Sequence, residues 1–397
     1  MLSRFHTLNS LLIKHQQIWK TPVFQIFDFS YLAEHETAVQ LLLSLSDTEV
    51  ERLESDDLAL LCRLEKDFPD AAAIAQCIRF AEIDNVQQID PPKFWNTDIP
   101  GRKEQQILAF STALGSIEDP LVEWCCGKQH LGRLLAEQHQ RTAIGLDIDA
   151  GLIKQAQNLA EKRKLQARVS SVCCDVLSEQ AESFIDASKH VIALHACGGL
   201  HSCLVQTAAK KRATRISFSP CCYHRFLDSP EYQALSEPGR LSTLKINQEE
   251  LRLAVRETQT ASTGETHKRK TLQAWRLGFD ALQRDLLKVD QYLPIPAISP
   301  QILQTDFKCF CEHAARLKGI QLTAGLNYSH YLESGRERFH LYQRMELFRM
   351  VFRRALESWL VLDKALFLEE QGYRCEIRQF CAAEVSPRNL LVQARRT

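Results

Sequence analysis

The sequence has no long apolar run, no net charge and no cysteine spacing of the CxxC type. No segment approaches the roughly 20 apolar residues that a transmembrane helix needs. The first twenty residues lack the apolar core and the cleavage site of a signal peptide. We therefore expect a cytoplasmic protein without a membrane partner.

The 14 cysteines do not form the pattern of a disulfide framework. Three adjacent pairs, Cys125–Cys126, Cys173–Cys174 and Cys221–Cys222, fall at the ends of predicted strands. Disulfide frameworks are typical of short secreted chains, and this chain has 397 residues. We expect reduced thiols in an intracellular protein.

Charge is balanced overall but unevenly distributed. The chain has 49 basic and 49 acidic residues, which is not the strongly basic composition of a typical nucleic-acid module. The first hundred residues are acidic, and a positive surplus lies after residue 200. This asymmetry permits an anionic substrate.

Short β-rich runs alternate with helical stretches between residues 101 and 226. The runs are LVEW, AIGLDID, ARVSSVCCDV, HVIALHACGG and RISFSPCCYHRF. Such alternation predicts βαβ units and a mostly parallel sheet. Ligands of these sheets bind beyond the carboxyl ends of the strands, so we expect the functional residues there.

Helical segments flank this predicted sheet. Residues 1–95 carry leucine and alanine at helical spacing, and Ser46 with Glu49 predicts a capping box. Residues 227–370 are predicted as a helical insertion. Residues 371–397 then supply two late strands that complete the sheet.

The turn after the first strand favours one nucleotide cofactor over another. S-adenosylmethionine-binding turns usually show an acid followed by three glycines at alternate positions. Here Glu123 holds the acidic place and Gly127 the central glycine, while Cys125 and Gln129 replace the outer glycines. As a GxGxxG turn for a dinucleotide the same window keeps one glycine of three. The turn therefore indicates S-adenosylmethionine more than NAD.

Acidic residues follow the second and third runs. Asp147 lies 20 residues after the glycine turn, where a carboxylate accepts hydrogen bonds from ribose hydroxyls, although a capping or surface acid is the alternative. Asp175 lies where the adenine amino group would find an acceptor, although Asp also begins turns. We include the residues that follow, Ile148 and Val176, in the cofactor site. Asp149 is expected to cap the next helix.

The candidate catalytic residues lie at the tips of the fourth and fifth runs: His195, Cys222, Tyr223 and His224. A histidine of near-neutral pKa suits proton removal from an acceptor, and a tyrosine suits stacking or orienting a base. His195, Cys197, His224 and one cysteine of the Cys221–Cys222 pair could also form a zinc site. A Cys–Cys dipeptide rarely turns both thiolates to one ion, so we expect no metal.

The motifs LHACGG, SPCCYH and VSPRNLLVQA resemble a group of Rossmann-like methyltransferases. The group includes the glutathione-S-transferase-C-terminal-domain-containing and methyltransferase-like proteins and, distantly, the tRNA ribose methyltransferase of the acceptor stem. The resemblance implies a Rossmann-like methyltransferase sheet with a late antiparallel strand. It also implies S-adenosylmethionine at Glu123, Cys125 and Gly127, with Asp147 on ribose and Asp175 near adenine.

Three functions remain open from the sequence. We expect an S-adenosylmethionine-dependent methyltransferase with RNA, either tRNA or rRNA, as its partner. A methyltransferase for a protein or a small molecule is the second possibility. The third is a non-catalytic binding module that keeps the sheet, because Cys125 and Gln129 depart from the usual turn. The sequence indicates no oligomeric state.

Overall fold

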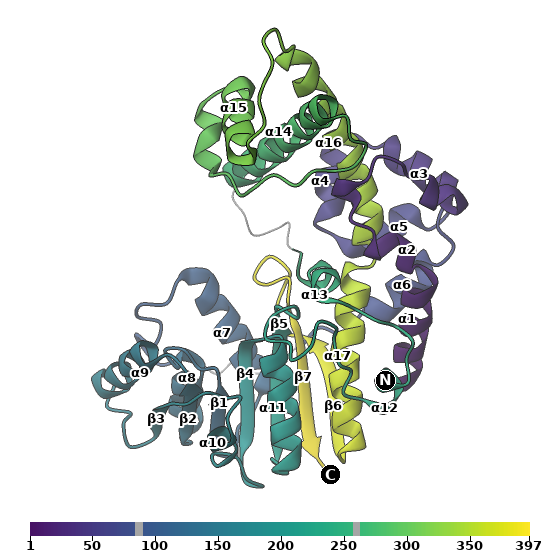
Figure 1. The fold of residues 1–397 in the computed structure, drawn as a ribbon. Helices are drawn as coiled ribbons and strands as arrows, with labels where there is room; N and C mark the ends of the chain where they lie inside the picture. Colours follow the sequence, from purple (N-terminus) through teal and green to yellow (C-terminus); the bar gives the residue numbers. More distant parts are fainter. Residues whose placement is uncertain (84–89, 257–262) are drawn as a thin grey trace. The chain divides into compact units, whose positions relative to one another are not determined.

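The computed structural model describes residues 1–83, 90–256 and 263–397 (Figure 1). Its central feature is a seven-stranded sheet of order β3-β2-β1-β4-β5-β7-β6. The strands are β1 (Leu121–Trp124), β2 (Ala143–Asp147), β3 (Val169–Cys173), β4 (His190–Cys197), β5 (Arg215–Cys221), β6 (Tyr373–Gln379) and β7 (Leu390–Arg396). β7 runs antiparallel to both of its neighbours, β5 and β6, and all the other strand pairs of this sheet are parallel. The predicted Rossmann-like sheet with a late antiparallel strand is confirmed.

The chain divides into two compact units whose bounds differ from the predicted segments. Unit 1 is Met1–Lys14, Gln76–Glu257 and Arg353–Thr397, and unit 2 is His15–Ala75 and Thr258–Phe352. The first and last helices of the predicted helical regions thus belong with the sheet. Residues 15–75 and the part of the insertion between residues 258 and 352 form the helical unit.

Unit 1 surrounds the sheet with helices. They are α1 (Leu2–Lys14), α7 (Gly101–Leu114), α8 (His130–His139), α9 (Ala150–Lys162), α10 (Glu179–Glu182), α11 (Gly199–Lys210), α12 (Glu237–Arg240), α13 (Gln248–Leu251) and α17 (Arg353–Glu370). Phe110 of α7, Leu134 of α8 and Ile192 of β4 belong to one apolar cluster. All four residues of β1 are buried, as expected for a parallel strand covered on both faces.

A buried carboxylate fixes the chain segment that follows the sheet's fifth strand. Asp363 of α17 is fully buried and accepts hydrogen bonds from the backbone amides of Leu235 and Ser236 at 2.9 and 3.0 Å. The hydroxyl groups of Ser236 and Tyr232 also donate to it. Since a buried carboxylate needs such partners, this network holds residues 232–236 against α17.

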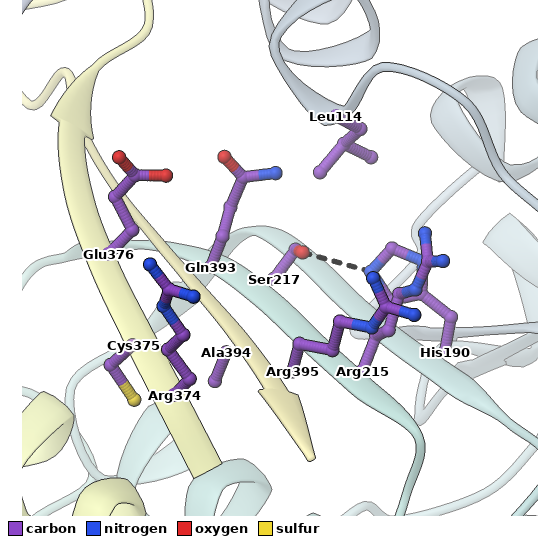
Figure 2. A pocket seen from close by; sticks show the side chains of 10 residues that line it. All are labelled: Leu114, His190, Arg215, Ser217, Arg374, Cys375, Glu376, Gln393, Ala394 and Arg395. Carbon is purple, nitrogen blue, oxygen red and sulfur yellow. Dashed lines mark hydrogen bonds between the residues drawn. The ribbon is translucent and has the colours of Figure 1, made fainter. Parts of the chain in front are cut away.

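A pocket of about 400 Å³ lies on the sheet at the amino ends of β4 and β5 (Figure 2). Its polar lining includes the side chains of His190, Arg215, Ser217, Arg374, Glu376, Gln393 and Arg395. Ser217 Oγ lies 2.9 Å from Nε2 of His190, a ring whose burial lowers its pKa to about 3. This pocket is at the opposite end of the strands from the predicted functional residues.

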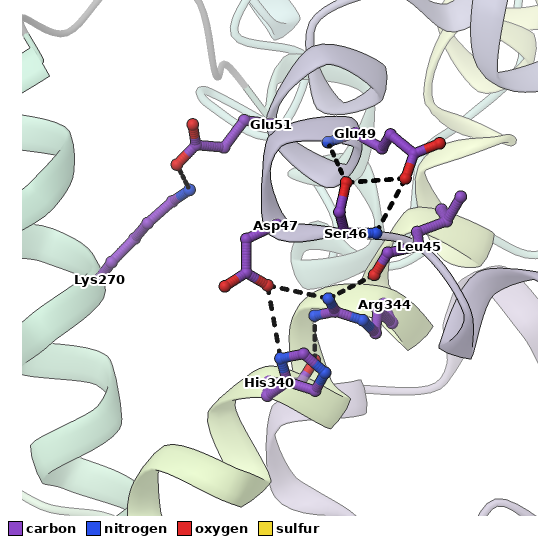
Figure 3. Close-up of polar contacts among 8 residues, drawn as sticks. All are labelled: Leu45, Ser46, Asp47, Glu49, Glu51, Lys270, His340 and Arg344. Carbon is purple, nitrogen blue, oxygen red and sulfur yellow. Dashed lines mark hydrogen bonds and ion pairs between the residues drawn. The ribbon is translucent and has the colours of Figure 1, made fainter.

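Unit 2 is helical. Its helices are α2 (Gln16–Lys20), α3 (Glu36–Leu43), α4 (Asp47–Glu54), α5 (Asp57–Leu64), α14 (Thr263–Leu287), α15 (Phe307–Lys318) and α16 (Tyr328–Met350), and α6 (Ala71–Ile78) contains the boundary between the units. Arg344 is buried and donates to Leu45 O and Asp47 Oδ1 (Figure 3). The predicted capping box of Ser46 and Glu49 is present.

Among the described residues, no helix combines the length and the apolar composition that crossing a membrane requires. All fourteen cysteines are free thiols, as the sequence predicted.

Candidate active site

The turn after β1 leaves open space beside a carboxylate. Gly127 has φ +54°, and no atom lies within 4 Å of the position that a Cβ would occupy there. Asp147 Oδ2 accepts a hydrogen bond from the Gly127 amide at 2.8 Å, and its Oδ1 accepts one from Asp149 N at 3.0 Å. A carboxylate has about four acceptor positions, so Asp147 retains capacity for the hydroxyl groups of a ligand. The predicted cap by Asp149 is also present.

Gln129 does not occupy the space at Gly127. Its side chain is 1% exposed, and its Oε1 accepts a hydrogen bond from the Ser171 hydroxyl at 2.6 Å. A Cβ added to Gly145 of β2 would lie 2.7 Å from Gln129 Cδ. The side chain thus points inward over β2 and β3. Its backbone has φ +53°, a left-handed conformation that costs a non-glycine residue about 1–2 kcal/mol.

Glu123, which the sequence predicted in the cofactor site, is buried beneath the turn. The side chain is 5% exposed, and its Oε2 accepts a hydrogen bond from Gly132 N in the first turn of α8. A Cβ at Gly132 would lie 2.5 Å from the same oxygen. Burial raises the pKa of Glu123 from its ordinary 4.5 to about 8.

The remaining predicted cofactor residues differ in their exposure. Ile148 is 68% exposed directly after Asp147, and Asp175 is exposed with its Oδ1 accepting a hydrogen bond from Leu177 N. Val176 is buried, so only its backbone is available. Leu177 is 49% exposed beside Asp175. Its exposure could not be predicted, because a single exposed leucine belongs to no sequence pattern.

Burial raises the pKa of the Cys125 thiol, and the negative charge of Asp147 adds to the effect. Cys125 therefore lies in the turn as a neutral, half-buried thiol with φ +55°. It occupies a position where glycine would adopt the same backbone without strain.

His195 lies in a β-bulge at the tip of β4. The register between β4 and β5 shifts between Leu194 and Cys197, and His195 has φ +74°. Its Nε2 lies 2.8 Å from Oε1 of Gln106 on α7, which orients the ring. Bulges of this kind re-aim a side chain near functional sites.

Two glycines allow the chain after β4 to pass close to the turn after β5. A Cβ at Gly198 would lie 1.9 Å from Arg225 O, and a Cβ at Gly199 would lie 1.6 Å from Phe226 O. The amide of Gly199 donates to Arg225 O at 2.9 Å. The Gly-Gly of LHACGG is therefore required by the path of the PCCYHRF turn.

Tyr223 and His224 lie on this turn with different exposure. Tyr223 is 2% exposed and burial raises its pKa well above the usual value, so its ring packs inside and offers no face for stacking a base. His224 is half-buried. Burial lowers its pKa, with the positive charge of Arg252 as the next cause, so the ring is neutral near pH 7.

The structure brings Cys222 together with two other thiols. The sulfur atoms of Cys197, Cys221 and Cys222 all lie within 4.8 Å of one another, and those of Cys197 and Cys221 are 3.7 Å apart. Thiol hydrogen bonds from Cys197 and Cys221 lower the pKa of Cys222. The four candidate catalytic residues thus come from two adjacent strand tips, as predicted.

One family model matches the part of the chain that carries this site. Residues 105–228 match a family described as a methyltransferase domain. No curated protein sequence matches the chain.

Several solved structures share a distant likeness. A geranyl diphosphate C-methyltransferase from Streptomyces coelicolor A3(2), in complex with Mg²⁺, geranyl diphosphate and S-adenosyl-L-homocysteine, has a TM-score of 0.28 and 15% identity over 36% of this chain and 56% of that chain. An RNA methyltransferase from Salinibacter ruber, in complex with S-adenosyl-L-homocysteine, has a TM-score of 0.26 and 14% identity over 34% of this chain and 84% of that chain.

The chain covers 45% to 60% of the length of the first geranyl diphosphate methyltransferase structures. At TM-scores this low, the likenesses carry no argument about function. The family model and the sheet agree in position: the matched residues 105–228 include the five parallel strands β1 to β5.

Proposed function

We propose that this chain is a methyltransferase that uses S-adenosylmethionine, with RNA as the methyl acceptor. The observation that carries the proposal is the open space at Gly127 beside the carboxylate of Asp147, at the carboxyl end of a sheet within the methyltransferase domain. Parallel sheets bind nucleotides at this edge.

The residues at the edge suit the parts of the cofactor. S-adenosylmethionine supplies an activated methyl group when bound, so the protein's task is mainly to hold donor and acceptor in line. The free acceptor positions of Asp147 suit the ribose hydroxyls, and the exposed carboxylate of Asp175 suits the adenine amino group. The exposed side chains of Ile148 and Leu177 offer apolar surface to the adenine ring.

The tips of β4 and β5 suit the acceptor side. A hydroxyl acceptor must lose a proton, and a neutral histidine at hydrogen-bond distance accepts one. His224 is neutral near pH 7 and half-buried, and His195 is held by Gln106. These two imidazoles are the proposed bases.

Positive charge near the turn after β5 supports RNA as the methyl acceptor. Arg225 and Arg388 act on the thiol of Cys222, and Arg252 and Arg225 act on the imidazole of His224, each lowering the pKa of the group it faces. Arg252 also forms an ion pair with Glu249 at 3.1 Å, so Arg225 and Arg388 are the arginines here that favour a polyanion.

The basic residues before this turn contribute less to the RNA proposal. Lys210 and Lys211 form ion pairs with Glu182, and Arg215 pairs with Glu118. Arg215 also begins β5, at the opposite end of the strand from the proposed site.

Isothermal titration calorimetry of the whole chain tests cofactor binding. We expect Asp147→Ala to weaken S-adenosylmethionine binding at least about tenfold, equivalent to about 1.4 kcal/mol, because ribose and the Gly127 amide both lose an acceptor. Asp186→Ala, which removes an exposed acid from the turn before β4, is the matched control and should bind as the parent does. Failure of the parent to bind would leave the non-catalytic module as the function.

Transfer of a tritiated methyl group to fractionated cell extract tests the acceptor. The proposal expects label in the RNA fraction that ribonuclease removes. Label confined to protein or to small molecules would contradict RNA and favour the alternative acceptors.

A further inference from the structure

The three thiols at the tips of β4 and β5 have the geometry of a metal site. A tetrahedral zinc ion with bonds of about 2.3 Å to sulfur separates its thiolates by about 3.8 Å. The sulfur atoms of Cys197 and Cys221 lie 3.7 Å apart, and the Cys222 sulfur lies within 4.8 Å of both. Small side-chain rotations bring all three sulfur atoms to bonding distance of one ion.

The backbone explains how adjacent cysteines reach the same point. Cys197 and Cys221 are directly paired across β4 and β5, so their side chains start from neighbouring positions. Successive residues of a strand point to opposite faces, and Cys222 would therefore point away from Cys221 if the strand continued. Instead Cys222 has φ +44°, which ends the strand and returns its sulfur to the cluster.

The left-handed backbone of Cys222 supports the assignment because this conformation costs free energy. A non-glycine residue in this region costs about 1–3 kcal/mol, and such strain persists where the surrounding structure requires it. Glycine would relieve the strain but would remove the third sulfur. The expectation that a Cys–Cys pair rarely turns both thiolates to one ion therefore does not apply to this turn.

We propose that Cys197, Cys221 and Cys222 bind one zinc ion through three thiolates. Thiolate ligands select zinc among the common divalent ions. Among the described residues, no further His, Cys, Asp or Glu ligand atom joins the three sulfur atoms within the same distance. The fourth position is thus open to water or to an oxygen or sulfur atom of the acceptor, as in catalytic zinc sites. Zinc binding itself does not depend on the proposed cofactor, whereas the role of the fourth position rests on the proposed methyltransferase function.

Such a site changes the role of Cys222. As a zinc ligand it holds the metal, and the ion would lower the pKa of a hydroxyl or thiol group bound at the fourth position. The zinc would then lie at the two strand tips that also carry His195 and His224. Methyl acceptors with an oxygen or sulfur nucleophile fit this arrangement.

Elemental analysis tests the proposal directly. The full chain is purified with reductant and without chelator, and its metals are measured by mass spectrometry. We expect about one zinc per chain. Zinc should be lost in Cys222→Ser and retained in Cys173→Ser, a matched control in another adjacent cysteine pair at a strand end.

Cobalt substitution gives a second readout that does not depend on activity. Co²⁺ added to the metal-free chain should produce a sulfur-to-cobalt charge-transfer band, and the band should weaken in Cys222→Ser as one thiolate is lost. Circular dichroism of that variant shows whether it is folded. Reduced parent protein that takes up neither zinc nor cobalt would overturn the proposal. Retention of full zinc in folded Cys222→Ser would do the same, as would copper in place of zinc.

Discussion

The carboxyl group of Glu123 is buried under the first turn of α8, and this position makes stability depend on pH. Burial raises its pKa from 4.5 to about 8 in the folded chain. Between these values the folded state holds a proton that the unfolded state has released. The free energy of unfolding therefore falls as pH rises from about 4.5 to about 8, by up to about 1.4 kcal/mol per pH unit.

Replacing Glu123 by Gln should remove this contribution. The amide oxygen still accepts the hydrogen bond from Gly132 N, and no charge has to be buried. We expect the free energy of unfolding of the variant, relative to that of the parent, to rise by about 3.5 kcal/mol from about pH 5 to pH 8, measured by urea unfolding. Glu161→Gln changes an exposed acid on α9. Its free energy of unfolding relative to the parent should not change with pH. If the free energy of unfolding of Glu123→Gln relative to the parent is also independent of pH, the pKa of Glu123 is ordinary.

Spacing along the chain predicts where the candidate residues lie, but it does not predict which of them are buried. Asp147 follows from its distance to the glycine turn, because that spacing reflects a local βαβ unit. Glu123 and Tyr223 were placed correctly at strand ends, but their burial depends on α8 and on distant segments. Periodicity does not show which polar side chain at a strand end points inward.

At the scale of elements, the crossing of two turns depends on Gly199. A Cβ there would lie 1.6 Å from the Phe226 carbonyl oxygen and 2.7 Å from its carbon, and backbone atoms cannot move aside cheaply. We expect Gly199→Ala to lower the free energy of unfolding by more than about 2 kcal/mol in urea. Gly101→Ala, at the start of α7 with no atom within 4 Å, should be neutral or slightly stabilising. Equal stability of the two variants would mean that the turns can separate without cost.

The alternation of β-rich and helical segments predicted the parallel strands of the sheet, because each strand is encoded by a short stretch of consecutive residues. The bounds of the units were not predictable in the same way. Helices α1 and α17 lie at opposite ends of the chain and pack in unit 1, where Trp359 Nε1 donates to Asn9 Oδ1 at 3.1 Å. Only tertiary contact reveals such a pairing, since both helices carry ordinary amphipathic patterns.

At the scale of the whole molecule, the two units have separate buried polar networks, and unit 2 depends on Asp280. This residue of α14 is fully buried. Its Oδ2 accepts from Arg338 at 2.8 Å, and its Oδ1 accepts from Leu293 N at 3.0 Å. Removing one partner of such a pair leaves an uncompensated charge and costs about 3–5 kcal/mol. Asp280→Ala should therefore destabilise unit 2 strongly.

Hydrogen exchange measured peptide by peptide locates the effect. We expect faster exchange in α14, α15 and α16 of Asp280→Ala, while the amides of β1, β2 and β4 exchange as in the parent, because the sheet has its own core. Asp290→Ala removes an exposed acid of the same unit and should leave both sets unchanged. Exchange that rises equally in the helices and the strands would show that the units unfold as one cooperative structure. In that case the helical unit contributes to the stability of the sheet itself.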